Sequence, residues 1–330
     1  MTKDQILAIL ARENTYVSGE KISKELGLSR AAVNTAVKSL RKEGYQIAST
    51  TNKGYLLESM PDLLTSGSVG MYLPQERMQT VLVLDEIDST NKKLRELAYE
   101  GAADGQVVIA DCQTGGRGRK GRSFASPANV GIYFSILLRP DMQPADAVTV
   151  TAWTAVSIAR AVKRVCRVDV GIKWVNDLVL HTRKICGILT EMSIESESGH
   201  IENIIIGIGV NVNNERSDFA PELSDIATSL HIETGRSFSR AALAAAMVEE
   251  MDRLRQAWPD GKEEFLEAYR DMNITTGRKI SVITLGVDKE PAEATALAIN
   301  DDFSLLVEYT DGSRENLSSG EVSIRGIYGQ

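Results

Sequence analysis

The sequence contains no long hydrophobic run, although hydrophobic residues make up 43% of its 330 positions. No window approaches the roughly 18 consecutive apolar residues that cross a bilayer, and an amphipathic pattern, not an apolar leader, begins after Met1. These absences argue against membrane and secreted proteins. We therefore expect a cytoplasmic protein with enough apolar residues for about two or three packed domains.

Cysteine and histidine are equally scarce, at three residues each. Cys112, Cys166 and Cys186 are odd in number and have no CxxC spacing, which suits a reducing compartment and provides no metal framework. The histidines are scattered along the chain. The sequence therefore predicts neither a His-rich metal site nor a catalytic triad.

Acidic residues outnumber basic ones, but the two kinds are unevenly distributed. The net charge of the whole chain is −8. Residues 1–58 contain nine Lys and Arg against six Asp and Glu, a balance of +3, so the remainder carries −11. A basic part and an acidic part suggest different partners.

The basic N-terminal part has the pattern of a helix-turn-helix. Apolar residues recur at helical spacing in residues 6–10, 22–26 and 33–40. Gly27 is suited to end the second helix, and Ser29 is suited to cap the third. A turn signal at Asn52, Lys53 and Gly54 then predicts a hairpin, so we expect a winged helix-turn-helix.

Polar side chains on the third helix and on the hairpin are the candidate DNA contacts. They lie opposite the apolar stripe and are of types that contact base edges and phosphates. These residues are Ser29, Arg30, Asn34, Thr35, Lys38 and Lys53. A helical module used only for dimerisation or packing is the alternative, because such patterns are short and easily imitated.

A polar triplet, Ser89, Thr90 and Asn91, separates an apolar run at residues 81–84 from a helical pattern. Simple N-capping explains one hydroxyl at such a corner. Two hydroxyls and an amide in succession could instead surround a small polar ligand. Both interpretations stay open on the sequence alone.

Four cations and four glycines occur together in residues 115–122, the Gly-Arg loop, after a predicted strand at 107–110. Repulsion and glycine entropy predict that this loop is mobile until an anion neutralises it. It is not a Walker A loop, because Arg122 occupies the lysine position and Pro127 prevents a long helix from following. The glycines favour wrapping of a small phosphate-containing ligand over a nucleic-acid patch, the alternative.

Four further motifs follow. Lys-Trp-Val-Asn-Asp occupies residues 173–177, Arg-Lys-Ile-Cys-Gly residues 183–187 and Gly-Ile-Gly-Val-Asn residues 207–211. Gly-Glu-Val-Ser-Ile-Arg occupies residues 320–325. These motifs, the polar triplet and the Gly-Arg loop occur in the order and approximate spacing of one known family. The chain resembles the bacterial bifunctional biotin protein ligases, also called biotin operon repressors, over essentially its full length.

The resemblance implies an adenylation followed by an acyl transfer. The carboxylate of biotin attacks the α-phosphate of ATP, so cations are needed where two anions meet. Biotinyl-5′-AMP then acylates a carrier-domain lysine without an enzyme nucleophile, and an ordered loop shields it from water. Biotin and ATP with Mg²⁺ are thus implied, and the implied partners are carrier domains, operator DNA and, once adenylate is bound, a second copy of the chain.

The resemblance also implies roles for individual residues, none of them a certain metal ligand. The implied catalytic residues are Lys184, Arg119 and Arg117. The implied biotin site comprises Ser89, Thr90, Asn91, Gln113, Gly116, Arg117, Gly118, Arg119, Lys184 and Gly187. The implied ATP and adenylate site comprises Arg119, Arg122, Phe124, Lys173, Trp174, Asn176, Asp177 and Asn211, with Asp177 near Mg-ATP.

An α+β fold in several parts follows from these patterns and the resemblance. We expect the winged helix-turn-helix at residues 1–60 and a linker at 61–79. A class II synthetase-like catalytic domain with a mixed sheet should occupy residues 80–275, and a small SH3-like β-barrel residues 276–330. Glu321 and Arg325 of this last part are candidates for closing over ATP.

Other functions stay open. A lipoate ligase has a related catalytic fold, although the Gly-Arg loop argues against it. A ligand-sensing repressor without catalysis is disfavoured by the presence of Lys184. A third possibility is an enzyme whose N-terminal module never contacts DNA.

Overall fold

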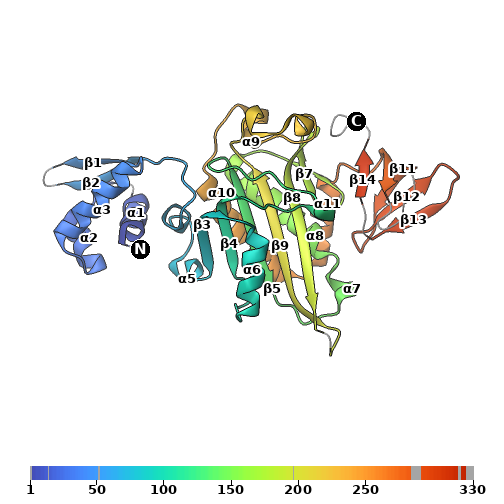
Figure 1. The fold of residues 1–330 in the computed structure, drawn as a ribbon, viewed down its shortest axis with the longest axis horizontal. Coiled ribbons are helices and arrows are strands. Elements are labelled where there is room, and N and C mark those ends of the chain that lie inside the picture. The colour runs from blue at the N-terminus through green and yellow to red at the C-terminus, as the bar shows by residue number, and fades with distance from the viewer. Residues whose placement is uncertain are drawn as a thin grey trace.

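Residues 2–13, 15–50, 53–195, 197–283, 291–318 and 321–324 are described by a computed structural model. A helical N-terminal unit lies at one end of the molecule, a large sheet with helices on both faces in the centre, and a smaller sheet at the other end (Figure 1). Asn52, Gly320 and Arg325, which belong to predicted motifs, lie outside the described residues.

The N-terminal unit confirms the predicted helix-turn-helix. Its elements are α1 Thr2–Glu13, α2 Gly19–Leu26, α3 Arg30–Lys42, β1 Gln46–Thr50 and β2 Gly54–Ser59. Gly27 ends α2 at a φ of 65°, a left-handed conformation that glycine adopts without strain, and the Ser29 hydroxyl accepts the N–H of Ala32 at 3.1 Å. The strands β1 and β2 pair antiparallel as the wing.

The connection to the centre is more ordered than its sequence indicated. It contains α4 Ser66–Gly70 and α5 Gln75–Met78, and Leu64 and Val69 are buried in the central core. Gly67 packs closely against Asp4 of α1. This segment therefore contacts both units that it joins.

The central sheet has seven strands in the order β3-β4-β5-β9-β8-β7-β6. Only the β3 and β4 pair is parallel among these neighbours of the described chain. The strands are β3 Val81–Ile87, β4 Val107–Gln113, β5 Gly131–Leu138, β6 Gly171–Lys173, β7 Asp177–Leu180, β8 Arg183–Ile194 and β9 Ile201–Asn211.

Helices cover the two faces of this sheet unequally (Figure 1). One face packs against α8 Val150–Cys166 and α10 Arg240–Ala257, with α11 Lys262–Met272 against α8. The other packs against α6 Thr90–Tyr99. The remaining helices are α7 Pro144–Ala147 and α9 Leu230–Thr234, with 3₁₀ turns at Arg119–Gly121, Arg216–Asp218 and Pro221–Leu223.

The pattern of β9 leaves part of the α6 face open. Alternate residues of a strand share a face, so Ile205, Gly207, Gly209 and Asn211 point the same way. Ile205 is buried in the small core beneath α6. The two glycines next along the strand add no side chains, which leaves space above the sheet.

The C-terminal sheet has five antiparallel strands in the order β13-β12-β11-β10-β14. They are β10 Lys279–Ile283, β11 Ala292–Ile299, β12 Leu305–Tyr309, β13 Arg314–Leu317 and β14 Glu321–Ile324. The pairings of the described residues form an open order, so the predicted SH3-like barrel is not confirmed. The buried apolar residues of this C-terminal sheet belong to the same core as those of the central sheet.

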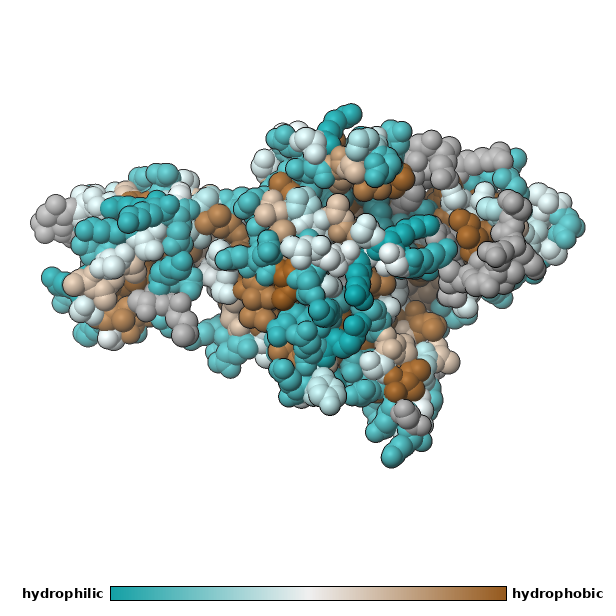
Figure 2. All heavy atoms as spheres, in the orientation of Figure 1, coloured by the Kyte–Doolittle hydropathy of each residue, from teal (hydrophilic) through white to brown (hydrophobic). Residues whose placement is uncertain are grey.

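On the face that Figure 2 shows, the surface is mainly hydrophilic, and its hydrophobic residues lie in separate groups. Within the described ranges, no helix has the length and apolar character needed to span a membrane.

Candidate functional site

One cavity brings together most of the predicted site residues. Its volume is about 660 Å³, and the Gly-Arg loop and the open part of β9 both line it. The predicted residues that line it are Ser89, Thr90, Asn91, Gln113, Arg117, Gly118, Arg119, Arg122, Phe124, Lys173, Trp174, Asn176, Asp177, Lys184, Gly187 and Asn211. Gly116 is predicted but is not in this lining; Ser126 Oγ would lie 2.6 Å from a Cβ there, so a side chain would disturb the loop.

The polar triplet forms one wall of the cavity. Ser89 precedes α6, yet its hydroxyl makes no capping hydrogen bond, so capping does not explain this side chain. The N–H of Thr90 donates to Gln113 Oε1 at 2.9 Å, and Gln113 Nε2 donates to Ser126 Oγ at 3.0 Å. Ser89, Thr90 and Asn91 are each at most 5% exposed. The wall is therefore a preorganised set of hydrogen-bonding groups.

The Gly-Arg loop forms a tight hairpin at the edge of the cavity. Arg117 and Ser123 pair as an antiparallel bridge, and the Gly118 N–H donates to the Arg122 carbonyl at 2.7 Å. A 3₁₀ turn at Arg119–Gly121 forms its tip. Its mobility in the absence of an anion stays a prediction.

Charged groups also line the cavity. Lys184 Nζ of β8 lies 2.6 Å from Asp177 Oδ1, and Arg119 Nη1 donates to Asn176 Oδ1 at 2.9 Å. A Cβ at Gly187 would lie 2.8 Å from Lys184 Nζ, so glycine leaves room for the lysine. The Gly-Arg loop and the start of β8 thus present cationic groups to the cavity, and the turn before β7 adds the Asn176 amide.

Three other predicted residues are buried in the walls. Lys173 is 6% exposed. The Trp174 indole N–H donates to the Phe303 carbonyl at 3.0 Å, and Asn211 Nδ2 donates to the Thr228 carbonyl at 3.0 Å. The last two side chains therefore also hold neighbouring segments in place.

Cys186, between Lys184 and Gly187, is fully buried. Burial raises the pKa of its thiol well above the ordinary value, so the thiol stays protonated and is unsuited to nucleophilic attack.

Several lining residues were not predicted. A segment with no helical or strand period supplies Phe219, Glu222, Leu223, Ile226 and Ala227, and the C-terminal sheet supplies Ile283, Val322 and Ser323. The backbone N–H of Lys184 donates to the Ile226 carbonyl at 2.8 Å, which holds this segment beside β8. No local pattern marks such residues, because they reach the cavity through long-range packing.

The N-terminal unit presents the predicted DNA contacts to solvent. Arg30, Asn34, Thr35 and Lys38 are exposed on α3, as are Ser29 before it and Lys53 before β2. The exposed Arg30 guanidinium lies 2.6 Å from Glu20 Oε2. Such an exposed ion pair contributes little stability and leaves the arginine available to a stronger anion.

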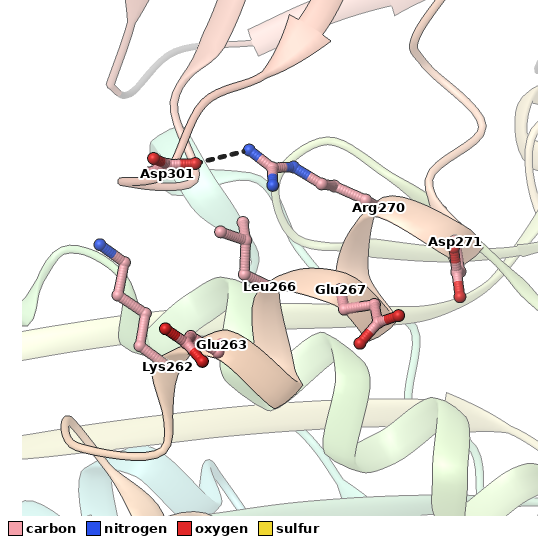
Figure 3. Close-up of a pocket in the computed structure, with 7 residues that line it drawn as sticks. All are labelled: Lys262, Glu263, Leu266, Glu267, Arg270, Asp271 and Asp301. Atoms are coloured by element: carbon pink, nitrogen blue, oxygen red, sulfur yellow. Dashed lines mark hydrogen bonds and ion pairs between the residues drawn. The ribbon is translucent and has the colours of Figure 1, made fainter.

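A second groove lies between α11 and the turn before β12 (Figure 3). Arg270 and Asp301 approach to 2.8 Å across it. Lys262, Glu263 and Glu267 add mixed charges to its α11 side. None of the predicted site residues lines this groove, and the cavity beside the Gly-Arg loop is the better candidate site.

The fold and the cavity define a protein-ligase domain joined to a helix-turn-helix. Residues 83–211 match the Biotin/lipoate A/B protein ligase family, and residues 2–56 match the HTH domain family. The chain is 34% identical over 321 residues to the Bifunctional ligase/repressor BirA of Bacillus subtilis, covering 97% of each protein. The Escherichia coli protein of the same name is 31% identical over 322 residues, which cover 97% of this chain and 96% of that one.

A solved structure, the biotin protein ligase from Aquifex aeolicus in complex with biotin and ATP, shares the fold. It is 26% identical with a TM-score of 0.62, covering 74% of this chain and 98% of that one. The chain belongs to the family of bifunctional ligase/repressors, which confirms the resemblance drawn from its motifs.

Proposed function

We propose that this chain attaches biotin to lysines of carrier domains and represses transcription in response to biotin. A carboxylate oxygen of biotin attacks the α-phosphorus of ATP, and pyrophosphate leaves. The lysine amine of the carrier then attacks the acyl carbon of biotinyl-5′-AMP; an amide forms, a proton is released and AMP leaves.

The observation that supports this most is the division of a single cavity into two kinds of wall. The polar triplet offers uncharged hydrogen-bonding groups that suit the ureido ring of biotin. Arg117, Arg119 and Lys184 offer positive charge where the carboxylate and the α-phosphate meet. The Aquifex structure is a complex with biotin and ATP, and these two ligands match the uncharged wall and the cationic wall respectively.

The remaining predicted roles are part of the same proposal. Arg122, Phe124, Lys173, Trp174, Asn176 and Asn211 border the adenylate. In the proposal Mg²⁺ enters with ATP and lies near Asp177. Glu321, the first residue of β14, helps to close over ATP.

The repressor role requires that ligand binding in the cavity affects DNA binding by the N-terminal winged helix. Adenylate orders the Gly-Arg loop, the ordered form favours a homodimer, and the dimer places two winged helices on a two-fold operator. The proposal also includes the domain bounds, which are 1–60, 80–275 and 276–330 with a linker at 61–79. The last domain closes in the manner of a barrel, and the protein acts in the cytoplasm.

The test of the ligase is ATP-dependent labelling of a biotin carrier domain by the purified chain, detected with streptavidin. We expect labelling with biotin and ATP together and none when either is omitted. Competition with lipoate separates the two ligase classes, because a lipoate ligase would lose biotin labelling as lipoate is added. Absence of labelling under all conditions contradicts the ligase and favours a sensor without catalysis.

The test of the repressor is a gel shift with operator DNA. Biotin and ATP together should tighten binding relative to the chain alone. Equal binding with and without them removes the coupling from the proposal.

A further inference from the structure

A buried hydrogen-bond network beneath the polar triplet leads to a carboxylate outside the cavity. Asn91 Nδ2 donates to Glu191 Oε2 at 2.7 Å, and Glu191 Oε1 lies 2.7 Å from Arg95 Nη2. Glu191 stands on β8, is not among the residues that line the cavity and belongs to none of the motifs. Yet it contacts the Asn91 side chain, which also accepts a hydrogen bond from Ser135.

The carboxylate fixes which way the Asn91 amide faces. A carboxylate only accepts hydrogen bonds, so the amide nitrogen must point to Glu191 and the amide oxygen must point away from it. The Ser135 hydroxyl, fully buried on β5, lies 2.6 Å from Asn91 Oδ1. An amide oxygen also only accepts, and Ser135 therefore donates its single proton there.

The orientation of Ser135 in turn determines what Thr90 offers to a ligand. Thr90 Oγ1 lies 2.7 Å from Ser135 Oγ and 3.1 Å from Gln113 Oε1. With the Ser135 proton committed to Asn91, the Thr90 proton goes to one of these two oxygens. In either case Thr90 presents only lone pairs to the cavity.

Close packing leaves the Asn91 amide no other freedom. A Cβ at Gly207 would lie 2.2 Å from Asn91 Oδ1 and 2.8 Å from Asn91 Cγ, so the amide packs closely against this glycine of β9. Rotation by half a turn, which exchanges its oxygen and nitrogen, is the remaining choice, and the charge of Glu191 decides it.

We propose that Glu191 is a positioning residue that sets the hydrogen-bond polarity of the triplet and so selects ligands with N–H donors. This rests on the proposed function, because the ureido ring of biotin has two N–H donors. Glu191→Gln keeps the size but lets the amide pair reverse. Asn91 can then donate to Ser135, which frees Ser135 to donate to Thr90 and to occupy one of the two lone pairs that Thr90 offers to a ligand.

The experiment measures the Kd for biotin by titration calorimetry, which requires no turnover, and the KM for ATP and kcat in the labelling assay. For Glu191→Gln we expect the Kd for biotin to rise about tenfold, equivalent to about 1.4 kcal/mol, with KM for ATP, kcat and Tm nearly unchanged. Desthiobiotin, which keeps the ureido ring, should lose the same factor. Glu96→Gln on α6, an exposed carboxylate paired with Lys93, is the matched control and should change nothing.

Arg95→Gln removes the ion pair but leaves the Glu191 carboxylate facing Asn91, so it should weaken biotin binding much less. The proposal is overturned if Glu191→Gln leaves the Kd for biotin unchanged, or if Arg95→Gln weakens it as much. It is also overturned if binding of both substrates and Tm fall together, since that indicates general destabilisation. Wild-type protein that binds biotin without labelling a carrier contradicts the proposed ligase only, whereas wild-type protein that binds no biotin contradicts both.

Discussion

Lys184 is the single side chain on which the proposed chemistry most depends. Its ammonium lies in the cavity, 25% exposed and 2.6 Å from Asp177. Lys184→Ala removes the positive charge from the point where two anions meet, so labelling should fall about 100-fold or more. Streptavidin detection of a labelled carrier and ATP–pyrophosphate exchange both report this loss.

The matched control is Lys163→Ala, which removes an exposed lysine that is paired with Asp169 and does not line the cavity. It should leave labelling unchanged. Tm must be recorded for both variants, because Lys184→Ala leaves Asp177 without this partner. Full labelling by a folded Lys184→Ala protein would remove Lys184 from the mechanism.

Which residues could be predicted depends on where they stand in their elements. The triplet and Gln113 lie at the ends of strands, where polar residues after an apolar run are conspicuous in a sequence. Ser135 and Glu191 lie inside strands, where a polar residue also fits an exposed face or a buried pair. Only the strand order reveals that they meet Asn91.

At the scale of elements, the glycines of β9 make the site possible. A Cβ at Gly209 would lie 2.5 Å from Phe124 Cε1 and 2.6 Å from Phe124 Cζ. The far end of an aromatic side chain can move, so Gly209→Ala should displace the ring and leave the fold intact. We expect the affinity for a biotinyl-adenylate analogue to fall about tenfold, because a displacement of about 1 Å is costly in a preorganised site.

Two variants give this prediction its controls. Gly70→Ala places its Cβ 3.6 Å from Met78, an ordinary contact, and should not affect ligand affinity. Phe124→Leu combined with Gly209→Ala should weaken the analogue less than the sum of the single changes, because the smaller side chain removes the clash. Strict additivity would show that the two residues do not interact.

A second element-scale feature is the brace around Glu233, which is 7% exposed. It accepts hydrogen bonds from Thr228 at 2.6 Å and contacts His181 and Arg183 at 2.6 Å, tying the β7–β8 hairpin to the segment that lines the cavity. Burial opposes ionisation, but the hydrogen bonds of Thr228 and His181 and the charge of Arg183 outweigh it. They hold the pKa of Glu233 below its ordinary value of 4.5.

A lowered pKa means that this stabilisation is present above pH 4.5 and is lost as pH falls below it. Glu233→Gln should therefore unfold more easily than wild type at pH 7, by about 1–3 kcal/mol. The difference should shrink as pH falls below about 4.5. Denaturant unfolding across this range measures it, and Glu264→Gln, which alters an exposed pair with Arg160, should show no such trend.

Elements were predictable where their periodicity is strong. The helix-turn-helix and the strand at 107–110 occur as expected, because their apolar residues form clear patterns and the helix caps are local. β13 was missed since three of its four residues are exposed and polar at the edge of a sheet. α4 was missed because its five residues are stabilised by packing against two units.

At the scale of the whole molecule, a buried arginine joins the N-terminal connection to the centre. Arg240, at the start of α10, is fully buried and donates through Nε to Asp62 Oδ2 at 2.8 Å and through Nη2 to the Asp62 carbonyl at 2.7 Å. It also pairs with Asp111, two residues before Gln113. The connection and strand β4, whose last residue Gln113 lines the cavity, therefore share one ionic network.

This network decides where the chain can be cut to separate the two proposed functions. A protein of residues 61–330 keeps Asp62 and should label carriers with unchanged KM while failing to bind operator DNA. A protein of residues 66–330 leaves Arg240 without one of its two carboxylates, at a cost on the order of 3 kcal/mol in unfolding free energy.

Asp62→Asn in the full chain should show a similar loss of stability with the winged helix still present, which separates the loss of the carboxylate from the loss of the domain. Operator binding by the 61–330 protein would contradict the N-terminal assignment, and equal stability of the two truncated proteins would show that Asp62 contributes nothing to the junction.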